Sequence, residues 1–220
     1  MRVTLLSEPQ YGTVLTEFFS SHPTIELVTS GAEIVIDTLF YDLEEKYTSL
    51  RSFESQNAIL ITNTLTAPAT AIARNVTGFK RVIGVPILPS ELASQKAIEY
   101  STPLQQEDMS SNGELLKSLL RKDVERIGDC VGGIFPRTIA MVINEAAFAL
   151  QENIATAADI DTAMRLGTNY PKGPLAWCDE LGAYTVCAIL EALQVEYGHG
   201  RYKIAPLLRL HAESGKKFYV

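Results

Sequence analysis

The stretch DIDTAMRLGTNYPKGPLAWCDELG, residues 159–182, decides how the second half of this chain folds. Its beginning is typical of a helix, because the four residues TAAD that end on its first Asp match a capping box. We expect that helix to end at Gly167, since glycine favours the position just after a helix C-terminus. Pro171, Gly173 and Pro174 restrict the backbone that follows to one path. The stretch therefore predicts two helices joined by a rigid corner.

Helical patterns also occupy the remainder of the second half. The run RTIAMVINEAAFALQEN, residues 137–153, places its apolar residues on one face with the spacing of a helix. Two further apolar helices are predicted at residues 181–198 and 205–214. The character of the chain changes near residue 130, and we place the domain boundary there. Residues 130–220 are thus predicted to form an all-α domain.

The first half, residues 1–129, alternates short β-rich runs with helical spacings. The predicted strands are RVTLL (2–6), IELV (25–28), AEIVID (32–37), NAILITNT (57–64), FKRVIGVPIL (79–88) and VERIGD (124–129). The predicted helices lie at 11–21, 40–55, 68–76 and 114–122, and residues 101–113 are expected to form a loop. This alternation favours a parallel, doubly wound sheet, so the predicted fold class is α/β plus all-α.

Composition narrows the class of partner. The chain has 220 residues, 46% of them hydrophobic and 20% charged, which is typical of a soluble globular protein. Its formal net charge of −7 argues against a nucleic-acid surface, which requires clustered Lys and Arg. No apolar run approaches the ~18 residues of a membrane span, and the N-terminus lacks the pattern of a secretory signal. We expect neither a membrane nor a nucleic acid as partner.

Cysteine usage indicates the compartment. The three cysteines, Cys130, Cys178 and Cys187, are odd in number and widely spaced. A disulfide framework is therefore not expected, and there is no CxxC pair that would indicate a zinc site. We predict no metal site and a location in the reducing cytoplasm.

Residues 133–219 resemble the C-terminal domain of the 3-hydroxyacyl-CoA dehydrogenases. The motifs that match are D-I-D-x-A-M-x-x-G, P-x-G-P-L and the closing F-Y, within NEAAFALQENIATAADIDTAMRLGTNYPKGPLAWCDELG and YGHGRYKIAPLLRLHAESGKKFY. The resemblance implies a helical domain that closes over the substrate cleft and carries the interface of a homodimer. The apolar faces of the helices at 137–150 and 181–197 are also broader than a small domain needs for its own core.

The first half resembles the Rossmann-like, NAD-binding domain of the same family, in a reduced form. Three segments carry this likeness without gaps: GAEIVIDTLFYDLEEKYTSL, ILITNT and FKRVIGVPILP. The resemblance implies NAD as the cofactor, an acyl-CoA ligand, and oxidation of a 3-hydroxyacyl-CoA to the 3-oxoacyl-CoA. It implies cofactor contacts for Gly12 in the glycine-rich turn and for Lys46 and Asn63 on the nicotinamide side.

The turn that would hold the NAD phosphates departs from the family's pattern. A dinucleotide turn needs G-x-G-x-x-G, so that the backbone can approach the pyrophosphate at a helix N-terminus. The matching residues here are Ser7, Pro9 and Gly12, and Pro9 also lacks a backbone N–H. The second strand ends in Thr29, where the ribose of NAD requires an acid. A family segment that grips CoA, directly after this strand, is shortened to a few residues.

The residues that carry the family's chemistry are also replaced. Removing a hydroxyl proton while a hydride leaves requires a base with a pKa near 7, usually a histidine polarised by a carboxylate. The family's serine, histidine and asparagine positions are Leu65, Pro86 and Pro136 in this chain. The polarising carboxylate matches Glu99, if one residue is inserted after Pro86. Glu99 is therefore the remaining candidate catalytic residue.

No other histidine is predicted to take over, because His22, His199 and His211 all fall outside the segments that form the cleft. Two main hypotheses follow. The chain is a member of the dehydrogenase family whose catalysis is impaired or lost, or it is a non-catalytic acyl-CoA-binding protein or dimeric scaffold for a partner protein. Different chemistry in a remodelled cleft is a third alternative.

Overall fold

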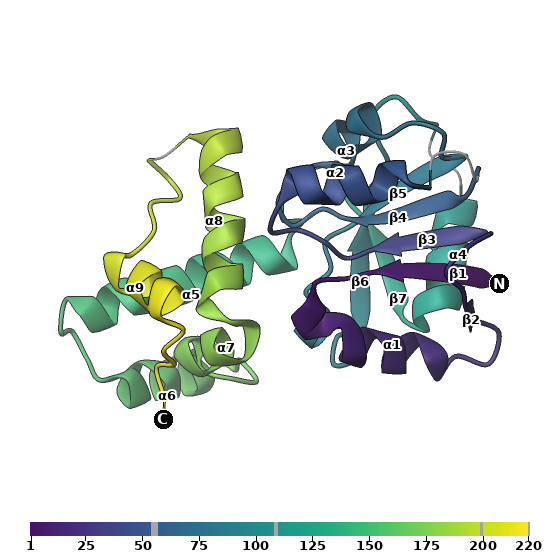
Figure 1. The fold of residues 1–220 in the computed structure, drawn as a ribbon. Coiled ribbons are helices and arrows are strands. Elements are labelled where there is room, and N and C mark those ends of the chain that lie inside the picture. Colours follow the sequence, from purple (N-terminus) through teal and green to yellow (C-terminus); the bar gives the residue numbers. More distant parts are fainter. Residues whose placement is uncertain (54–56, 108–109, 199, 220) are drawn as a thin grey trace. The chain divides into compact units, whose positions relative to one another are not determined.

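The computed structural model describes residues 1–53, 57–107, 110–198 and 200–219. The chain separates into two compact units, residues 1–133 and residues 134–220 (Figure 1). The first unit is built around a β-sheet and the second consists of helices, so the predicted combination of an α/β domain with an all-α domain is confirmed.

The main sheet of the first unit is entirely parallel and has the strand order β2-β1-β3-β4-β5. Its strands are β1 (Arg2–Leu6), β2 (Glu26–Leu27), β3 (Ile34–Asp37), β4 (Ile59–Asn63) and β5 (Arg81–Val85). The chain passes from β1 to β2 on one side and then returns to β3 on the other side of β1. The winding direction thus reverses between β1 and β3, and ligand crevices of such sheets lie at the carboxyl ends of the strands at this place.

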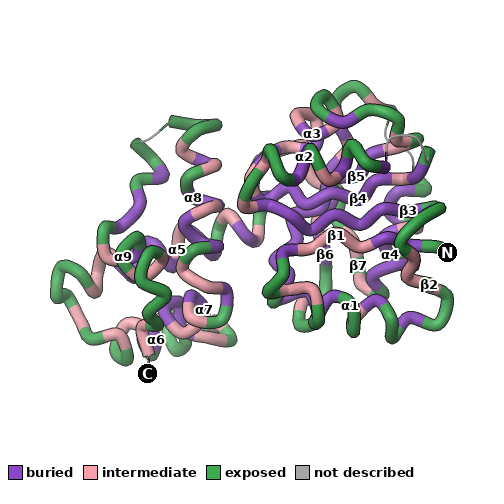
Figure 2. Tube along the Cα trace, viewed as in Figure 1, coloured by how far each residue is buried: buried purple, intermediate pink, exposed green. Residues whose placement is uncertain are grey.

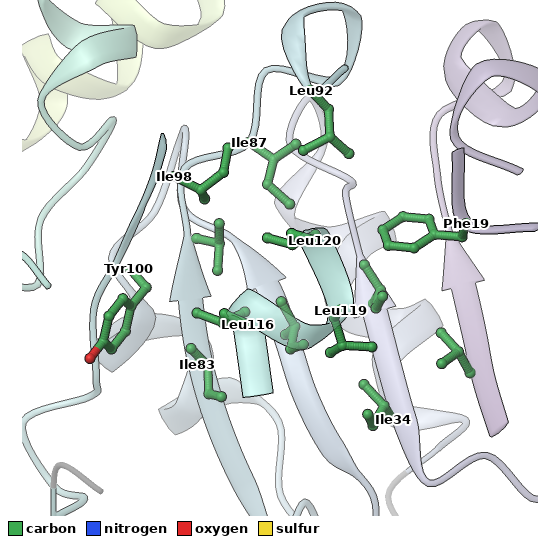
Figure 3. Packing of buried hydrophobic residues seen from close by; sticks show 14 of the residues in the cluster. Phe19, Ile34, Ile83, Ile87, Leu92, Ile98, Tyr100, Leu116, Leu119 and Leu120 are labelled. Atoms are coloured by element: carbon green, nitrogen blue, oxygen red, sulfur yellow. The ribbon is translucent and has the colours of Figure 1, made fainter. Parts of the chain in front are cut away.

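Helices cover both faces of this sheet. They are α1 (Gly12–Ser20) and α4 (Ser111–Leu120) on one face, and α2 (Leu43–Arg51) and α3 (Ala69–Asn75) on the other. Ile34 and Ile36 of β3 pack with α1 and α4, whereas Val35 between them packs with α2 and α3, because successive side chains of a strand point to opposite faces. Figure 3 shows Phe19 and Leu119 on the same side of the sheet as Ile34. Figure 2 shows the strands β3, β4 and β5 as the most continuously buried part of this unit.

The first unit also contains a two-stranded sheet, of which the sequence predicted only one strand. It pairs β6 (Ala97–Tyr100) with β7 (Asp123–Arg126) in parallel, and an antiparallel bridge between Gly84 and Ser101 connects β6 to β5. The sequence indicated β7 but no strand at β6, since a four-residue strand that follows a polar segment carries too short an alternation to be recognised. Two short 3₁₀ helices, Pro9–Tyr11 and Pro89–Glu91, follow β1 and β5.

The helical unit contains α5 (Phe135–Gln151), α6 (Ala157–Thr168), α7 (Pro174–Leu181), α8 (Ala183–Tyr197) and α9 (Pro206–Ser214). The Thr156 hydroxyl accepts the N–H of Asp159 at 3.2 Å, as the capping pattern predicts. The expected helix end at Gly167 is wrong, because α6 continues to Thr168. Asn169 takes the left-handed conformation with φ 56° instead, and asparagine tolerates this conformation better than most residues.

The corner between α6 and α7 is held by Asp161, the second Asp of the motif D-I-D. Its two carboxylate oxygens accept the backbone N–H groups of Leu175 at 2.8 Å and Ala176 at 2.9 Å, in the first turn of α7. The Tyr219 hydroxyl also donates to this carboxylate at 2.9 Å. A Cβ on Gly173 would overlap the Asp161 side chain, so close approach rather than backbone conformation requires glycine here. The motif therefore encodes a buried helix cap.

None of the helices in the described part of the chain is both long and apolar enough to cross a membrane.

Candidate functional site

Three polar side chains lie at the carboxyl edge of the main sheet, next to the reversal between β1 and β3. Asp37 ends β3, Asn63 ends β4, and Lys46 reaches them from α2. The Lys46 Nζ lies 2.8 Å from an Asp37 carboxylate oxygen, and neither side chain is exposed. The same Nζ donates to the carbonyl oxygens of Leu39 at 2.8 Å and Asn63 at 2.7 Å. Burial lowers the pKa of Lys46, and the adjacent Asp37 carboxylate opposes that shift.

The Asn63 side chain is likewise hydrogen-bonded to the protein's own backbone. Its Nδ2 donates to the carbonyls of Thr38 at 3.1 Å and Ile87 at 2.9 Å, while its Oδ1 accepts the N–H groups of Leu65 at 3.2 Å and Ile87 at 3.1 Å. This uses both donors of the amide and two acceptor sites on its oxygen. The structure thus brings the two predicted nicotinamide-side residues, Lys46 and Asn63, together, and there they fasten the loops after β3, β4 and β5.

Glu8, in the loop after β1, is hydrogen-bonded to the loop after β3. One oxygen of its buried carboxylate accepts the N–H groups of Phe40 at 3.2 Å and Tyr41 at 3.3 Å, in the loop after β3. The Tyr11 ring stacks on that of Phe40 with centroids 6.4 Å apart, and its hydroxyl lies 3.3 Å from the Tyr41 hydroxyl. A carboxylate and an aromatic cluster therefore bridge the loops after β1 and β3.

The third glycine position, Gly12, shows no sign of a phosphate turn. Gly12 is the first residue of α1 with an ordinary helical φ of −54°, and a Cβ there would lie 3.5 Å from the nearest atom, the Ser7 hydroxyl. Pro9 opens a 3₁₀ helix and has no N–H to offer. The residues in this turn do not fit the pyrophosphate of NAD, because the backbone donors are reduced and a negative side chain lies beside them.

Glu99 and Pro86 meet at Gly133. Glu99 lies on β6 and is half-buried, and Pro86 follows β5 and is buried. A Cβ placed on Gly133, whose φ is +60°, would contact both the Glu99 carboxylate and, at 2.5 Å, the Pro86 ring. The structure therefore brings the candidate carboxylate to the position that the sequence aligns with the family's histidine. A proline ring cannot accept a proton, so this pair lacks the base of a hydride-transfer site.

The other two replaced positions are structural. Leu65 is fully buried in the first unit, and its neighbour Thr66 donates its hydroxyl to the carbonyl of Phe40 at 2.6 Å. Pro136 is buried in the first turn of α5, where proline is tolerated because the first N–H groups of a helix have no partner within it.

The described histidines are engaged elsewhere. His22 lies 2.7 Å through Nε2 from the carbonyl of Ser118, which links the end of α1 to α4. His211 stacks on Phe218 with centroids 3.9 Å apart. His199 lies outside the described residues. Within the residues that the structure describes, no group of three metal-binding side chains comes together.

Two of the thiols, Cys178 and Cys187, are also unsuited to act as nucleophiles. Neither they nor Cys130 takes part in a disulfide within the described residues. Burial raises the pKa of Cys187 to about 11 and that of Cys178 still further. Because the thiolate is the reactive form, these two buried groups remain inert thiols near neutral pH.

Sequence reasoning missed Glu8 and Asp37. Asp37 had a signal, since an acidic residue at the end of a continuous apolar strand must find a partner once the strand is buried. Glu8 had none, because its bonds depend on how the loop after β3 meets the loop after β1.

Comparisons with known proteins agree with this fold. The family model "3-hydroxyacyl-CoA dehydrogenase, C-terminal domain" matches residues 132–218. The chain is similar to 3-hydroxyadipyl-CoA dehydrogenase of Escherichia coli, with 53% identity over 43% of this chain and 20% of that protein. It is also similar to a probable 3-hydroxybutyryl-CoA dehydrogenase of Bacillus subtilis, with 30% identity over 84% of this chain and 65% of that protein. The chain thus spans less than two thirds of either relative.

Solved structures show the same fold. (S)-3-hydroxybutyryl-CoA dehydrogenase from Ralstonia eutropha superposes with a TM-score of 0.75 at 22% identity, over 100% of this chain and 98% of that one. 3-Hydroxybutyryl-CoA dehydrogenase from Escherichia coli superposes with a TM-score of 0.60 at 36% identity, over 71% of this chain and 32% of that one. The matched family model therefore assigns the helical unit, residues 132–218, to the 3-hydroxyacyl-CoA dehydrogenase C-terminal domain family, and the curated relatives extend the similarity to dehydrogenases of that family into the first unit.

Proposed function

We propose that this chain is a 3-hydroxyacyl-CoA dehydrogenase homologue in which NAD-dependent oxidation of 3-hydroxyacyl-CoA is impaired or lost. The observation that carries the proposal is that Pro86 and the Glu99 carboxylate both lie directly against Gly133. The carboxylate is retained, but the imidazole that it would polarise is a proline. Loss of one general base typically lowers a rate by about 10²–10⁴-fold.

Two further positions of the sequence support the same proposal. Leu65 provides no hydroxyl at the family's serine position, and Pro136 provides no amide at the asparagine position. By kinship the cofactor is NAD, and we propose that its binding is weakened as well, because Lys46 and Asn63 already satisfy their hydrogen bonds within the protein.

Turnover tests the proposal directly. Purified protein is mixed with NADH and acetoacetyl-CoA, and the NADH absorbance is followed against a protein-free control and against an active 3-hydroxybutyryl-CoA dehydrogenase. We expect the rate to lie at least about 10²-fold below that of the active enzyme, down to that of the protein-free control. Turnover at the rate of the active enzyme that disappears in the variant Glu99→Gln would show that the carboxylate still drives the chemistry, and it would overturn the proposal.

The second candidate is a dimeric acyl-CoA-binding protein or scaffold without catalysis. It is favoured by the intact helical unit, which the family model matches almost from end to end, and by large apolar side chains exposed on that unit. They include Ile134, Ile154, Leu166, Tyr184, Val195, Tyr197 and Leu210, each at least 48% exposed. We propose that a second copy of the chain covers part of this surface.

Two measurements test the second candidate. Sedimentation velocity should report a dimer, and a monomer at high concentration would contradict the assembly. Saturating acetoacetyl-CoA should raise the melting temperature, because a ligand that binds only the folded state stabilises it. An unchanged melting temperature would exclude the acyl-CoA-binding version and leave the scaffold.

A further inference from the structure

Hydrogen bonds within the protein cross the place where a doubly wound sheet receives its anionic ligand. In such sheets the crevice lies outside the carboxyl ends of the two strands between which the winding reverses, here β1 and β3. Glu8 lies in the loop after β1, Phe40 and Tyr41 lie in the loop after β3, and the two loops are hydrogen-bonded through these residues. The crevice is therefore bridged from within the protein.

The contacts of Glu8 are those of a bound anion. One carboxylate oxygen accepts two consecutive backbone N–H groups, from Phe40 at 3.2 Å and Tyr41 at 3.3 Å. Consecutive N–H groups that converge on one oxygen form the type of cradle that also receives phosphate oxygens. Glu8 is 9% exposed, and its charge acts on the buried Lys46 nearby. The side chain is thus held inside the crevice and does not lie on the surface.

The aromatic residues reinforce this closure. Tyr11, three residues after Glu8, stacks on Phe40, and the Tyr11 and Tyr41 hydroxyls lie 3.3 Å apart. The Glu8 carboxylate and these rings tie the same two loops together. A ligand that enters between the loops has to displace a charge-assisted pair of hydrogen bonds and separate the rings.

We propose that Glu8 is an internal substitute for the anionic ligand of this crevice, and that it excludes the pyrophosphate of a dinucleotide from the first unit. This goes beyond the loss of the base at Pro86. It assigns the exclusion of the cofactor to one carboxylate and predicts that removal of that carboxylate creates an anion site. The backbone donors of Phe40 and Tyr41 then become available to phosphate oxygens.

Binding of ADP-ribose and NADH by the full chain tests this inference. Calorimetry measures ADP-ribose and fluorescence measures NADH, for the wild-type protein and for Glu8→Ala and Glu8→Gln. The matched control is Glu17→Ala, which removes an exposed carboxylate from α1 and changes the net charge equally. We expect Glu8→Ala to bind ADP-ribose at least about tenfold more tightly than the wild type and the control do.

Glu8→Gln keeps the size and the hydrogen-bond acceptor of the side chain, so it decides the test if Glu8→Ala fails to fold. It should also bind ADP-ribose more tightly than the wild type, because it removes the like charge. Saturable binding of NADH by the wild type, or affinities of the Glu8 variants that equal those of Glu17→Ala, would overturn the inference. If the wild type binds NADH but does not turn over, the inference about Glu8 is wrong, whereas the proposed loss of catalysis still holds.

Discussion

At the scale of single residues, Lys46 and Asn63, which the sequence aligns with cofactor contacts, form hydrogen bonds that hold the protein's own loops. Lys46 is fully buried, pairs with Asp37 and holds two carbonyl oxygens. A buried ion pair is weak evidence for stability when both partners are present, but one partner without the other is strongly destabilising. The structural role of Lys46 can therefore be separated from a role in binding.

Lys46→Met should lower the free energy of unfolding by about 3–5 kcal/mol, because Asp37 is left buried without a counter-ion. The matched control is Lys117→Met, which breaks a pair with Glu114 whose side chains are 49% and 78% exposed. That change should cost less than about 1 kcal/mol. Urea unfolding followed by circular dichroism measures both variants, and equal losses would contradict the structural role of Lys46.

Tyr219 provides a residue-scale test that depends on pH. Burial, and then the hydrogen bond to Asp161, raise the pKa of Tyr219 from 10.0 to about 12. The neutral phenol is thus favoured in the folded state, so its contribution is complete below about pH 10 and is lost as the pH rises through about 12. Tyr219→Phe should cost about 1 kcal/mol at neutral pH, the typical net contribution of one hydrogen bond.

The same variant should lose less stability than the wild type between pH 10 and pH 12. Unfolding free energies of both proteins across this range provide the comparison. Parallel curves would show that Tyr219 does not titrate as the structure implies.

At the scale of elements, the corner between α6 and α7 shows what the sequence predicts well. The path of the corner was predictable because proline and glycine restrict or free their own backbone. The interaction that holds the corner was not predictable, because the Asp161 carboxylate caps α7 by bonding a residue 14 positions later in the sequence. The same limit explains why β6 and the bonds of Glu8 were missed, whereas the five strands of the main sheet were predicted from their local patterns. Local patterns specify elements, and contacts between distant segments specify the site.

The corner can be tested with two glycines of the same segment. Gly173→Ala forces a Cβ into the Asp161 side chain and should destabilise the protein by about 1–3 kcal/mol. Gly167→Ala is the control, because it lies inside α6 with no atom within 4 Å of the added Cβ. It should stabilise the protein by about 0.5–1 kcal/mol, the usual difference between alanine and glycine in a helix.

Asp161→Ala probes the cap itself and should cost about 2–3 kcal/mol, because it leaves two N–H groups of α7 without their charged acceptor. Thermal and urea unfolding measure the three variants. A Gly173→Ala protein as stable as Gly167→Ala would refute the close approach at this corner.

At the scale of the whole molecule, the chain consists of a sheet unit and a helical unit, and the sequence aligns Leu65, Pro86 and Pro136 with the family's serine, histidine and asparagine positions. The fold was predictable because it depends on repeated apolar patterns, which tolerate substitution. That these three positions correspond to the family's serine, histidine and asparagine remains a prediction from its motifs. The hydrogen bonds of Glu8 to Phe40 and Tyr41 were not predictable, since they arise from the packing of two loops.

Transfer of deuterium is the most direct test of the central claim. The protein is incubated with acetoacetyl-CoA and NADH deuterated at the transferred C4 position, and 3-hydroxybutyryl-CoA is analysed by mass spectrometry. The account predicts no deuterated product above a protein-free control, since the position that the sequence aligns with the family's histidine is Pro86, whose ring cannot exchange a proton with the substrate oxygen. Deuterated product that forms with the wild type and disappears in Glu99→Gln would contradict it.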